Sequence, residues 1–178
     1  MFEKIKTKIR GTIDLPKLIK DGLKVGDNFN AQEGTIIDPG HCWLIEIGNN
    51  VTLAPRVHIL AHDASMKKFL GCTKIAPVKI GNNVFIGAGS IILPGVIIDD
   101  NVIVGAGSVV TKNLASGNVY GGVPASKLQS LSDYLDKIEK EKKNKTFFDE
   151  TFVIGNITDE KKEKMKTILE KEKKGYIV

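Results

Sequence analysis

The fold of this chain is decided by residues 80–109, IGNNVFIGAGSIILPGVIIDDNVIVGAGSV. An aliphatic residue opens each group of six in this stretch, and the same frame returns upstream in two shorter blocks. A period of six matches neither an α-helix, at about 3.6 residues, nor a plain strand, at about 2, unless each hexad is a short strand followed by a turn. The aliphatic positions are Val25, Ala31 and Ile37, then Ile47, Leu53 and Ile59, and then Ile80, Ile86, Ile92, Ile98, Val104 and Val110.

Side-chain alternation within each hexad points its first and fifth residues toward the interior. Gly, Asn and Asp lie between them, where a turn needs conformations that most residues resist. Three such hexads form one triangular coil, and stacked coils bury a continuous column of Ile and Val. Ordinary loops of an irregular β protein share this Gly and Asn content, but they do not keep an aliphatic residue in phase. The second inward position is held by Val51, Val57, Val84, Ser90, Val96, Val102 and Ser108.

The repeat is interrupted twice, briefly at residues 38–46, DPGHCWLIE, and at length over residues 60–79. An interruption in a stack of coils is looped outward, where it is free to carry function. We therefore expect a parallel β-helix domain over residues 25–127 with a protruding loop at 60–79. A lead-in segment at residues 1–24 precedes it.

The remaining residues, 128–178, predict a helical appendage. A first helix is expected over residues 128–143, and a second helix begins after Thr158, an N-cap followed by acidic residues, and runs to about Lys173. These helices are expected to cap or brace the neighbouring coil rather than to perform chemistry. The apolar stripe of the first helix consists of Leu128, Leu131, Leu135 and Ile138.

Charge and composition exclude several classes of protein. The formal net charge is +5, but most Lys residues lie beyond residue 126 and are interleaved with Glu, which is typical of solvated helix faces and not of a nucleic-acid surface. Neither Cys42 nor Cys72 belongs to a CxxC motif, so free thiols in a reducing compartment are expected. The chain starts without a signal peptide, and no apolar run is long enough for a membrane span. The sequence thus predicts a soluble, cytoplasmic protein.

Four phrases in order carry a resemblance to a known family: GNNVTLAPRVHILAHDAS, PVKIGNNVFIGAGSIILPGVII, GAGSVVTKN and GGVPA. Over residues 24–127 the chain resembles the maltose and galactoside O-acetyltransferase branch of the hexapeptide-repeat acyltransferases. The phrases HCWLI and LAHDAS look still more like a subgroup that acylates precursors of cell-surface polysaccharides. The resemblance implies a left-handed parallel β-helix, acetyl-CoA as acyl donor, a sugar or glycan-precursor acceptor, and a homotrimer with active sites between neighbouring subunits.

In that family the histidine of the long loop is the general base, and His62 matches it. A sugar hydroxyl is a poor nucleophile, and a base that titrates near neutrality can take its proton as it attacks a thioester. The resemblance further implies that the backbone N–H of Ala88 meets the oxyanion. It also matches Asp38 to an aspartate that positions the acceptor. Asp63 is a candidate to orient or charge-balance His62, but adjacent side chains often diverge, so a carboxylate more distant in sequence is preferred as the group that orients the ring.

The shorter interruption places His41 and Trp43 beside this machinery. They either pack and hydrogen-bond within the stack or line the acceptor pocket, with Trp43 stacking on a sugar ring. The resemblance implies that coenzyme A lies along the coils toward the C-terminal end, where small residues permit close approach and lysines can meet a phosphate. The implied coenzyme A residues are Phe85, Ala88, Ala106, Thr111, Lys112 and Lys127.

Two other classes remain as alternatives. Carbonic anhydrases of the γ type share the fold and bind zinc through three histidines, and this chain has His41, His58 and His62. His58 is the sixth residue of its hexad and is expected to point outward, so no metal site is predicted. The second alternative is a non-catalytic scaffold or sugar-binding β-helix, against which the loop position of His62 argues.

Overall fold

The computed structural model describes residues 13–178, so most of the expected lead-in segment, residues 1–12, lies outside the described residues. The chain divides into two compact units, one ending at Leu131 and one spanning Ser132–Val178. No helix of the described residues is long and apolar enough to cross a membrane.

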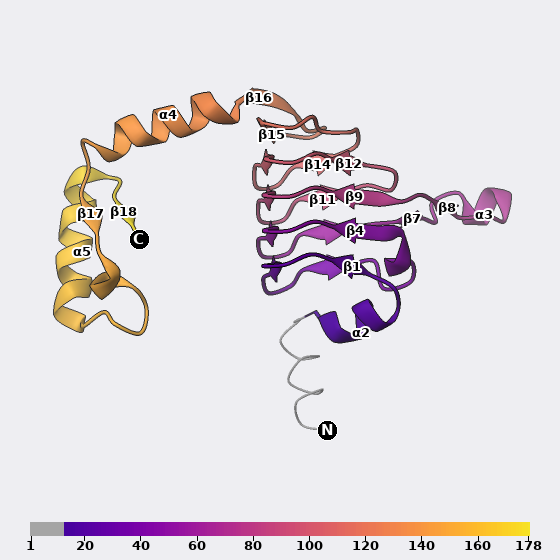
Figure 1. Ribbon diagram of the computed structural model, residues 1–178, viewed down its shortest axis with the longest axis horizontal. Coiled ribbons are helices and arrows are strands. Elements are labelled where there is room, and N and C mark those ends of the chain that lie inside the picture. Colours follow the sequence, from indigo (N-terminus) through magenta and orange to yellow (C-terminus); the bar gives the residue numbers. More distant parts are fainter. Residues whose placement is uncertain (1–12) are drawn as a thin grey trace, which may run out of the picture. The chain divides into compact units, whose positions relative to one another are not determined.

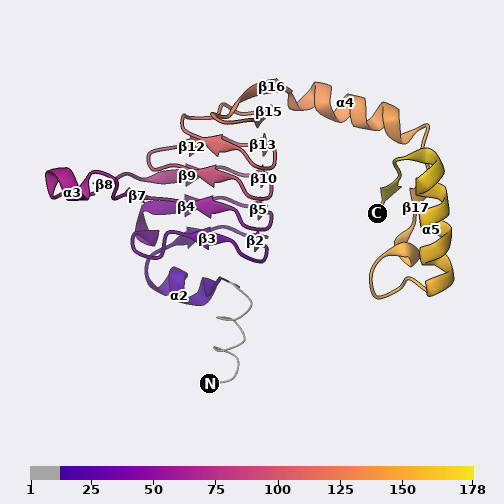
Figure 2. The same ribbon diagram turned by 180° about the vertical axis from the view of Figure 1, so that it is seen from behind.

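The first unit is a stack of coils in which each turn adds one short strand to each of three parallel sheets (Figures 1 and 2). We name these sheets A (β1, β4, β9, β12), B (β2, β5, β10, β13, β15, β16) and C (β3, β6, β11, β14). The first four coils contain β1 (Lys24–Val25), β2 (Asn30–Ala31) and β3 (Ile36–Ile37); β4 (Ile45–Ile47), β5 (Thr52–Leu53) and β6 (His58–Ile59); β9 (Val78–Ile80), β10 (Phe85–Ile86) and β11 (Ile91–Ile92); and β12 (Ile97–Ile98), β13 (Ile103–Val104) and β14 (Val109–Val110).

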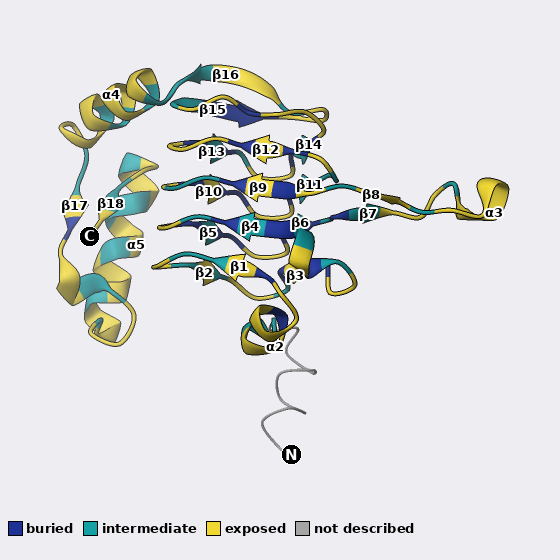
Figure 3. Cartoon of the chain, turned by 45° about the vertical axis from the view of Figure 1, so that its right-hand side comes forward, coloured by how far each residue is buried: buried dark blue, intermediate teal, exposed yellow. Residues whose placement is uncertain are grey.

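The core is the column of aliphatic side chains that the hexad frame predicts. In sheet C, Ile37 pairs with Ile59, Ile59 with Ile92, and Ile92 with Val110, so each aliphatic position lies over the one before it. These four side chains are buried. Figure 3 shows buried segments in dark blue along the strands of the stack. The second inward position is buried as well, including Ser90, whose hydroxyl donates to the carbonyl of Gly105 at 3.0 Å. The sequence prediction of inward first and fifth positions is confirmed, although Val25 and Ala31 in the first coil are only partly buried.

A ladder of asparagines explains why the turns between sheets A and B repeat. Asn28, Asn50, Asn83 and Asn101 each have φ between 54° and 57°, a left-handed conformation that Asn tolerates better than most residues. The side-chain amide of Asn28 donates to Asn50 at 2.9 Å, that of Asn50 to Asn83 at 3.0 Å, and that of Asn83 to Asn101 at 3.1 Å. Each coil therefore fixes the turn of the next.

The long interruption is an antiparallel hairpin, which the sequence did not predict beyond an outward loop. Strand β7 (His62–Asp63) pairs with β8 (Lys74–Ile75), and the short helix α3 (Lys67–Leu70) forms the tip. The hairpin projects away from the stack in Figures 1 to 3. The short interruption contains the 3₁₀ turn η1 (Cys42–Leu44), and helix α2 (Leu15–Lys20) precedes the first coil.

The last coil ends in a different way from the others. Leu114 bridges to Ile98 of sheet A, and β15 (Asn118–Gly121) continues sheet B before β16 (Ser126–Ser130) turns back antiparallel along it. Leu128 lies in β16, so the prediction that it opens the first C-terminal helix is wrong. Helix α4 begins at Leu131 because the preceding residues hydrogen-bond to the open edge of β15.

The second unit contains most of α4 (Leu131–Lys142), β17 (Phe147–Phe148), the 3₁₀ turn η2 (Glu150–Phe152), α5 (Asp159–Glu172) and β18 (Tyr176–Ile177). Thr158 is the N-cap of α5, and its hydroxyl accepts from the N–H of Lys161, which confirms that prediction. Strands β17 and β18 pair in parallel, and Phe148 is the buried centre of this unit.

Candidate active site

Both interruptions leave the stack at the same corner, where sheet C leads into sheet A, on neighbouring coils. Asp38 directly follows β3, and His62 lies three residues beyond the end of β6. The two strands pair in register, and the N–H of Asp38 donates to the carbonyl of Ile59 at 2.9 Å. The spacing between neighbouring strands, about 4.8 Å, therefore brings a residue of the short interruption next to one of the long interruption.

Asp38 is a buried carboxylate, 1% exposed, held by backbone donors. Its Oδ1 accepts from the N–H of Gly40 at 3.1 Å, and its Oδ2 accepts from the N–H of Ala61 at 3.0 Å. Burial by itself raises the pKa of Asp38, but the hydrogen bond from His62 and those from the two backbone groups outweigh it, so this pKa lies below its ordinary value. Asp38 is thus ionised at neutral pH.

His62 points its Nδ1 at this carboxylate, with 2.5 Å between Nδ1 and Oδ2 of Asp38. Because the ionised carboxylate can only accept, Nδ1 carries the proton, and Nε2 of the neutral ring keeps a free lone pair. The side chain of His62 is 37% exposed, which leaves the ring within reach of a substrate. A buried carboxylate that holds an imidazole in this tautomer is the arrangement that a general base requires.

His41 and Trp43 extend the cluster from the 3₁₀ turn η1. The ring centroids of His41 and His62 are 4.9 Å apart, and those of His41 and Trp43 are 5.3 Å apart. Trp43 is 54% exposed, so its indole offers an open aromatic face beside the two imidazoles. The ring of His41 therefore lies close to the rings of both His62 and Trp43.

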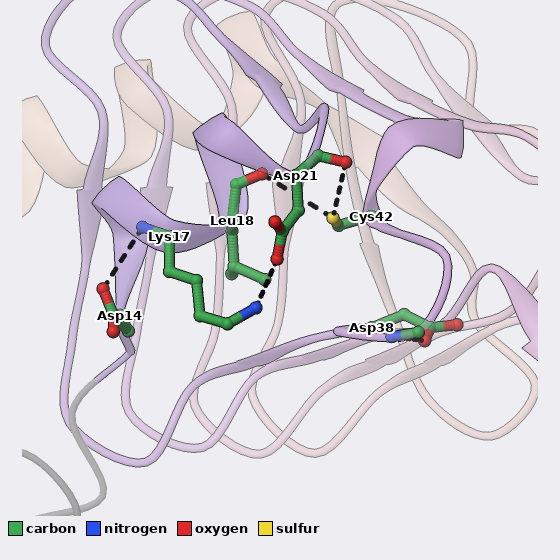
Figure 4. Close-up of polar contacts among 7 residues, drawn as sticks. Asp14, Lys17, Leu18, Asp21, Asp38 and Cys42 are labelled. Atoms are coloured by element: carbon green, nitrogen blue, oxygen red, sulfur yellow. Dashed lines mark hydrogen bonds and ion pairs between the residues drawn. The ribbon is translucent and has the colours of Figure 1, made fainter.

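The thiol of Cys42 anchors η1 to the helix before the first coil. Its Sγ lies 3.6 Å from the carbonyl oxygens of Leu18 and Asp21, both of which it approaches as a weak donor (Figure 4). Cys42 is fully buried, and Gly22 leaves no room for a side chain because a Cβ there would lie 2.8 Å from Cβ of Trp43. Cys42 and Trp43, which follow His41 in sequence, are therefore both packed against the segment that ends α2.

Nδ1 of His41 is buried and has no hydrogen-bond partner within the described residues. It lies 3.9 Å from Oδ1 of Asp38. Asp38, His41 and His62 each present one possible metal-ligating atom, and these atoms all lie within 4.8 Å of one another. His58 is not part of this group, so the set of three histidines weighed from the sequence is not brought together.

Asp63 directs its carboxylate along the hairpin. Its Oδ1 accepts from the N–H of Ser65 at 2.9 Å, and this hydrogen bond is the main reason why the pKa of Asp63 lies below its ordinary value. The ring of His62 instead donates its hydrogen bond to Asp38, on the neighbouring coil. Sequence reasoning did not assign this contact, although the hexad frame contained the signal: Ile37 and Ile59 occupy equivalent positions, so the residues after them share a corner.

The implied coenzyme A residues occupy two corners of the stack. Phe85 lies on sheet B, and Ala88 and Ala106 lie in turns that lead from sheet B to sheet C, stacked so that the N–H of Gly107 donates to the carbonyl of Ala88 at 2.8 Å. No hydrogen-bond partner is recorded for the N–H of Ala88 in the described part of the chain. Thr111 and Lys112 are exposed after β14, at the corner of His62, and Lys127 is exposed on β16.

The stacked coils of six-residue repeats define the fold of this protein, and comparison with known proteins identifies its class as the hexapeptide-repeat transferases. Residues 77–112 match the profile described as bacterial transferase hexapeptide (six repeats). Protein CapG of Staphylococcus aureus is 48% identical over 129 residues, which cover 68% of this chain and 74% of that protein. The galactoside O-acetyltransferase of Escherichia coli (strain K12) is 37% identical over 122 residues, covering 62% of this chain and 55% of that protein.

Two solved structures agree with these relatives. A maltose O-acetyltransferase from Clostridium difficile 630 has a TM-score of 0.54 and 43% identity, covering 61% of this chain and 59% of that one. A galactoside acetyltransferase in complex with coenzyme A has a TM-score of 0.52 and 28% identity, covering 68% and 72%. The chain belongs to the hexapeptide-repeat acetyltransferases, and its fold is the left-handed parallel β-helix of that family.

The chain spans only a little over half the length of the two O-acetyltransferases named for maltose and for E. coli galactoside. The acceptor and the residues that act on it are therefore taken up as a proposal.

Proposed function

We propose that this protein transfers the acetyl group of acetyl-CoA to a hydroxyl of a sugar or glycan precursor, with His62 as general base. The observation that carries the proposal is the 2.5 Å contact between Nδ1 of His62 and Oδ2 of the buried Asp38. It orients the ring and leaves Nε2 able to accept a proton. Acetyl-CoA as donor is supported by the related galactoside acetyltransferase that was crystallised with coenzyme A.

The reaction then needs no covalent enzyme intermediate. Nε2 of His62 takes the proton of the acceptor hydroxyl as its oxygen attacks the thioester carbonyl. The imidazolium that forms lies against the carboxylate of Asp38, and the tetrahedral oxyanion accepts a hydrogen bond from a backbone N–H, for which Ala88 is the candidate. The intermediate collapses by breaking the carbon–sulfur bond, and His62 returns its proton to the thiolate of coenzyme A.

For the acceptor, we assign the aromatic surface beside the base. Trp43 presents an exposed indole on which a sugar ring can stack, and the partly exposed ring of His41 lies beside it, with ring centroids 5.3 Å apart. Asp63, at the start of the hairpin, is placed to contact a further hydroxyl with the oxygen that Ser65 does not occupy. The sequence similarity to CapG and to the two sugar O-acetyltransferases supports a glycan acceptor.

We further propose that the active site forms between neighbouring copies in a homotrimer. In one chain the implied coenzyme A residues are divided: Ala88 and Ala106 lie at the corner between sheets B and C, whereas Thr111 and Lys112 lie at the corner of His62. The His62 side chain is 37% exposed, so water reaches the base in an isolated chain. A second copy whose corner between sheets B and C packs against His62 brings both groups of implied coenzyme A residues to one site. It also excludes water from the base.

The cytoplasm is the expected compartment, because acetyl-CoA is the proposed donor and both cysteines are free.

The test compares wild type, His62→Ala and His58→Ala with acetyl-CoA and a panel of sugars and nucleotide sugars. His58 lies on β6, four residues before the base and outside the cluster, so it is the matched histidine control. We expect His62→Ala to lose about 10²–10⁴-fold in turnover while it still binds coenzyme A, and His58→Ala to retain wild-type turnover. Equal turnover in His62→Ala and wild type contradicts the mechanism, and a wild type that does not bind coenzyme A contradicts the function.

A further inference from the structure

The proposed mechanism uses one nitrogen of His62 and one carboxylate of Asp38, and it leaves a third group unexplained. Nδ1 of His41 is buried, faces Oδ1 of Asp38 at 3.9 Å and has no hydrogen-bond partner within the described residues. A buried polar atom without a partner is costly, because it has lost its hydration and gained nothing in exchange. The atom is therefore expected to have a partner that comes from outside the chain.

The donor set around this atom is that of a transition-metal site. Two imidazoles and one carboxylate present ligating atoms within 4.8 Å of one another. Tetrahedral zinc holds nitrogen ligands at about 2.0–2.1 Å, which separates the ligand atoms by about 3.4 Å. Nδ1 of His62 lies 2.5 Å from Oδ2 of Asp38, and Nδ1 of His41 lies 3.9 Å from Oδ1, so each imidazole faces a different oxygen of the carboxylate. The 2.5 Å pair opens by roughly 1 Å once the proton between them is gone.

The surroundings hold these ligands in position. The N–H groups of Gly40 and Ala61 donate to the two carboxylate oxygens of Asp38, so its plane is fixed by backbone that a bound ion would not disturb. Outer hydrogen bonds of this kind orient metal ligands and strengthen their binding. His41 is fixed through Cys42, whose thiol contacts the end of α2 (Figure 4).

We propose that Asp38, His41 and His62 form a site for a divalent transition-metal ion such as Zn²⁺, and that the bound ion switches off the base. Three protein ligands leave the fourth position of a tetrahedral ion open to water. The binding part of this proposal is independent of the enzymatic reaction, whereas the switch rests on the proposed function.

The switch follows from the two nitrogens of one imidazole ring. In the active tautomer Nδ1 of His62 carries the proton and Nε2 carries the free lone pair. An ion that binds the Nδ1 lone pair requires the ring's single proton to reside on Nε2, and solvent can carry it there without net release. Nε2 then has no lone pair left to accept the proton of an acceptor hydroxyl, so the ion stops the reaction at the base.

Metal binding is measured on the untagged full chain without coenzyme A, because both polyhistidine tags and the coenzyme A thiol bind zinc. Co²⁺ reports geometry through its visible absorption, and Zn²⁺ affinity is obtained by competition with a chromophoric chelator. The variants are His41→Ala and His41→Gln, with His58→Ala as the histidine control and Cys72→Ser as the control for the exposed thiol. Melting curves establish that each variant is folded.

We expect one ion per chain in wild type, a tetrahedral cobalt spectrum, and an affinity at least about tenfold lower in both His41 variants. His58→Ala and Cys72→Ser are expected to stay within about twofold of wild type. Equal affinity in the His41 variants, or loss of binding in either control, overturns the site.

The switch has its own measurement, the initial loss of thioester absorbance in wild type with increasing Zn²⁺ and its recovery with EDTA. Inhibition that saturates with the zinc affinity measured by competition, and that more acetyl-CoA does not relieve, supports the switch. Full activity with the site filled overturns the switch and leaves the site standing. A wild type that binds zinc but never turns over contradicts the proposed function and not the metal site.

Discussion

Replacing Asp38 with Asn separates the charge of this residue from its hydrogen bonds. In Asp38→Asn the amide oxygen can keep both hydrogen bonds that Oδ2 accepts, from Nδ1 of His62 and from the N–H of Ala61. The new amide NH₂ group then faces the N–H of Gly40 across 3.1 Å, donor against donor. The tautomer of His62 is preserved in this orientation, whereas the carboxylate charge is lost.

The magnitude follows from the ion pair that forms in the transition state. When His62 takes the acceptor proton it becomes an imidazolium ion beside a carboxylate that is 1% exposed. Two unit charges about 4 Å apart attract by about 4 kcal/mol at an effective dielectric constant of about 20. The neutral ring of the ground state gains nothing from this attraction, so kcat/KM is expected to fall by about 10³-fold. The lost Gly40 hydrogen bond lowers the stability by about 1–3 kcal/mol.

The assay is initial thiol release from acetyl-CoA with an acceptor that wild type uses, together with coenzyme A affinity and a melting curve. Asp63→Asn is the comparison, because it removes a carboxylate next to His62 whose hydrogen bond goes to Ser65. A loss below about tenfold in folded Asp38→Asn refutes the reasoning on charge. A larger loss in Asp63→Asn than in Asp38→Asn refutes the choice of carboxylate.

Two further predictions concern the stability of the stack. Gly87→Ala places a Cβ 2.4 Å from the backbone nitrogen of Ala106. In the control variant Gly89→Ala no atom lies within 4 Å of the new Cβ, and the positive φ of 69° costs about 1–2 kcal/mol. We expect Gly87→Ala to have a melting temperature well below that of Gly89→Ala, and equal melting temperatures contradict the close stacking of coils. The pKa of Asp38 is lowered by folding, so its contribution to stability is complete above the unfolded pKa of about 3.9 and is lost as the pH falls through the lower folded value. Melting curves from neutral pH down to below that value are therefore expected to show a smaller acid destabilisation in His62→Ala than in wild type, and identical curves count against the Asp38–His62 contact.

The hexad frame predicts the core because each inward position is decided by local alternation alone. Ile86 and Val104 are buried because each opens a hexad of a regular coil. Their burial can be predicted from the hexad alone, without knowledge of distant residues. Leu128 shows the limit of this reasoning, since its spacing with Leu131 and Leu135 is that of a helix. The open edge of β15 takes it into a strand instead, and an unpaired edge is a property of the assembled stack rather than of the segment.

The hairpin at residues 60–79 was beyond prediction for a related reason. Its strands pair His62 with Ile75 and Asp63 with Lys74, and neither strand has the apolar alternation that marks a half-buried sheet. Its exposed tip carries Phe69, 85% exposed, so burial within one chain does not explain the sequence there. The conformation of this segment is set by the pairing of β7 with β8, which no periodicity in the sequence marks.

The candidate active site depends both on the regular stack of coils and on the two interruptions of the repeat. The stack sets the distance between neighbouring coils, and both interruptions leave it at one corner on adjacent coils, so the base and its carboxylate are positioned by the repeat. The parts proposed to face an acceptor, His41 with Trp43 at η1 and the hairpin after His62, are carried by the inserted residues. If the proposed function holds, changes in the outer parts of the insertions are expected to alter which hydroxyl is acetylated, whereas the contact between Asp38 and His62, at the roots of the two insertions, depends on the register of β3 with β6.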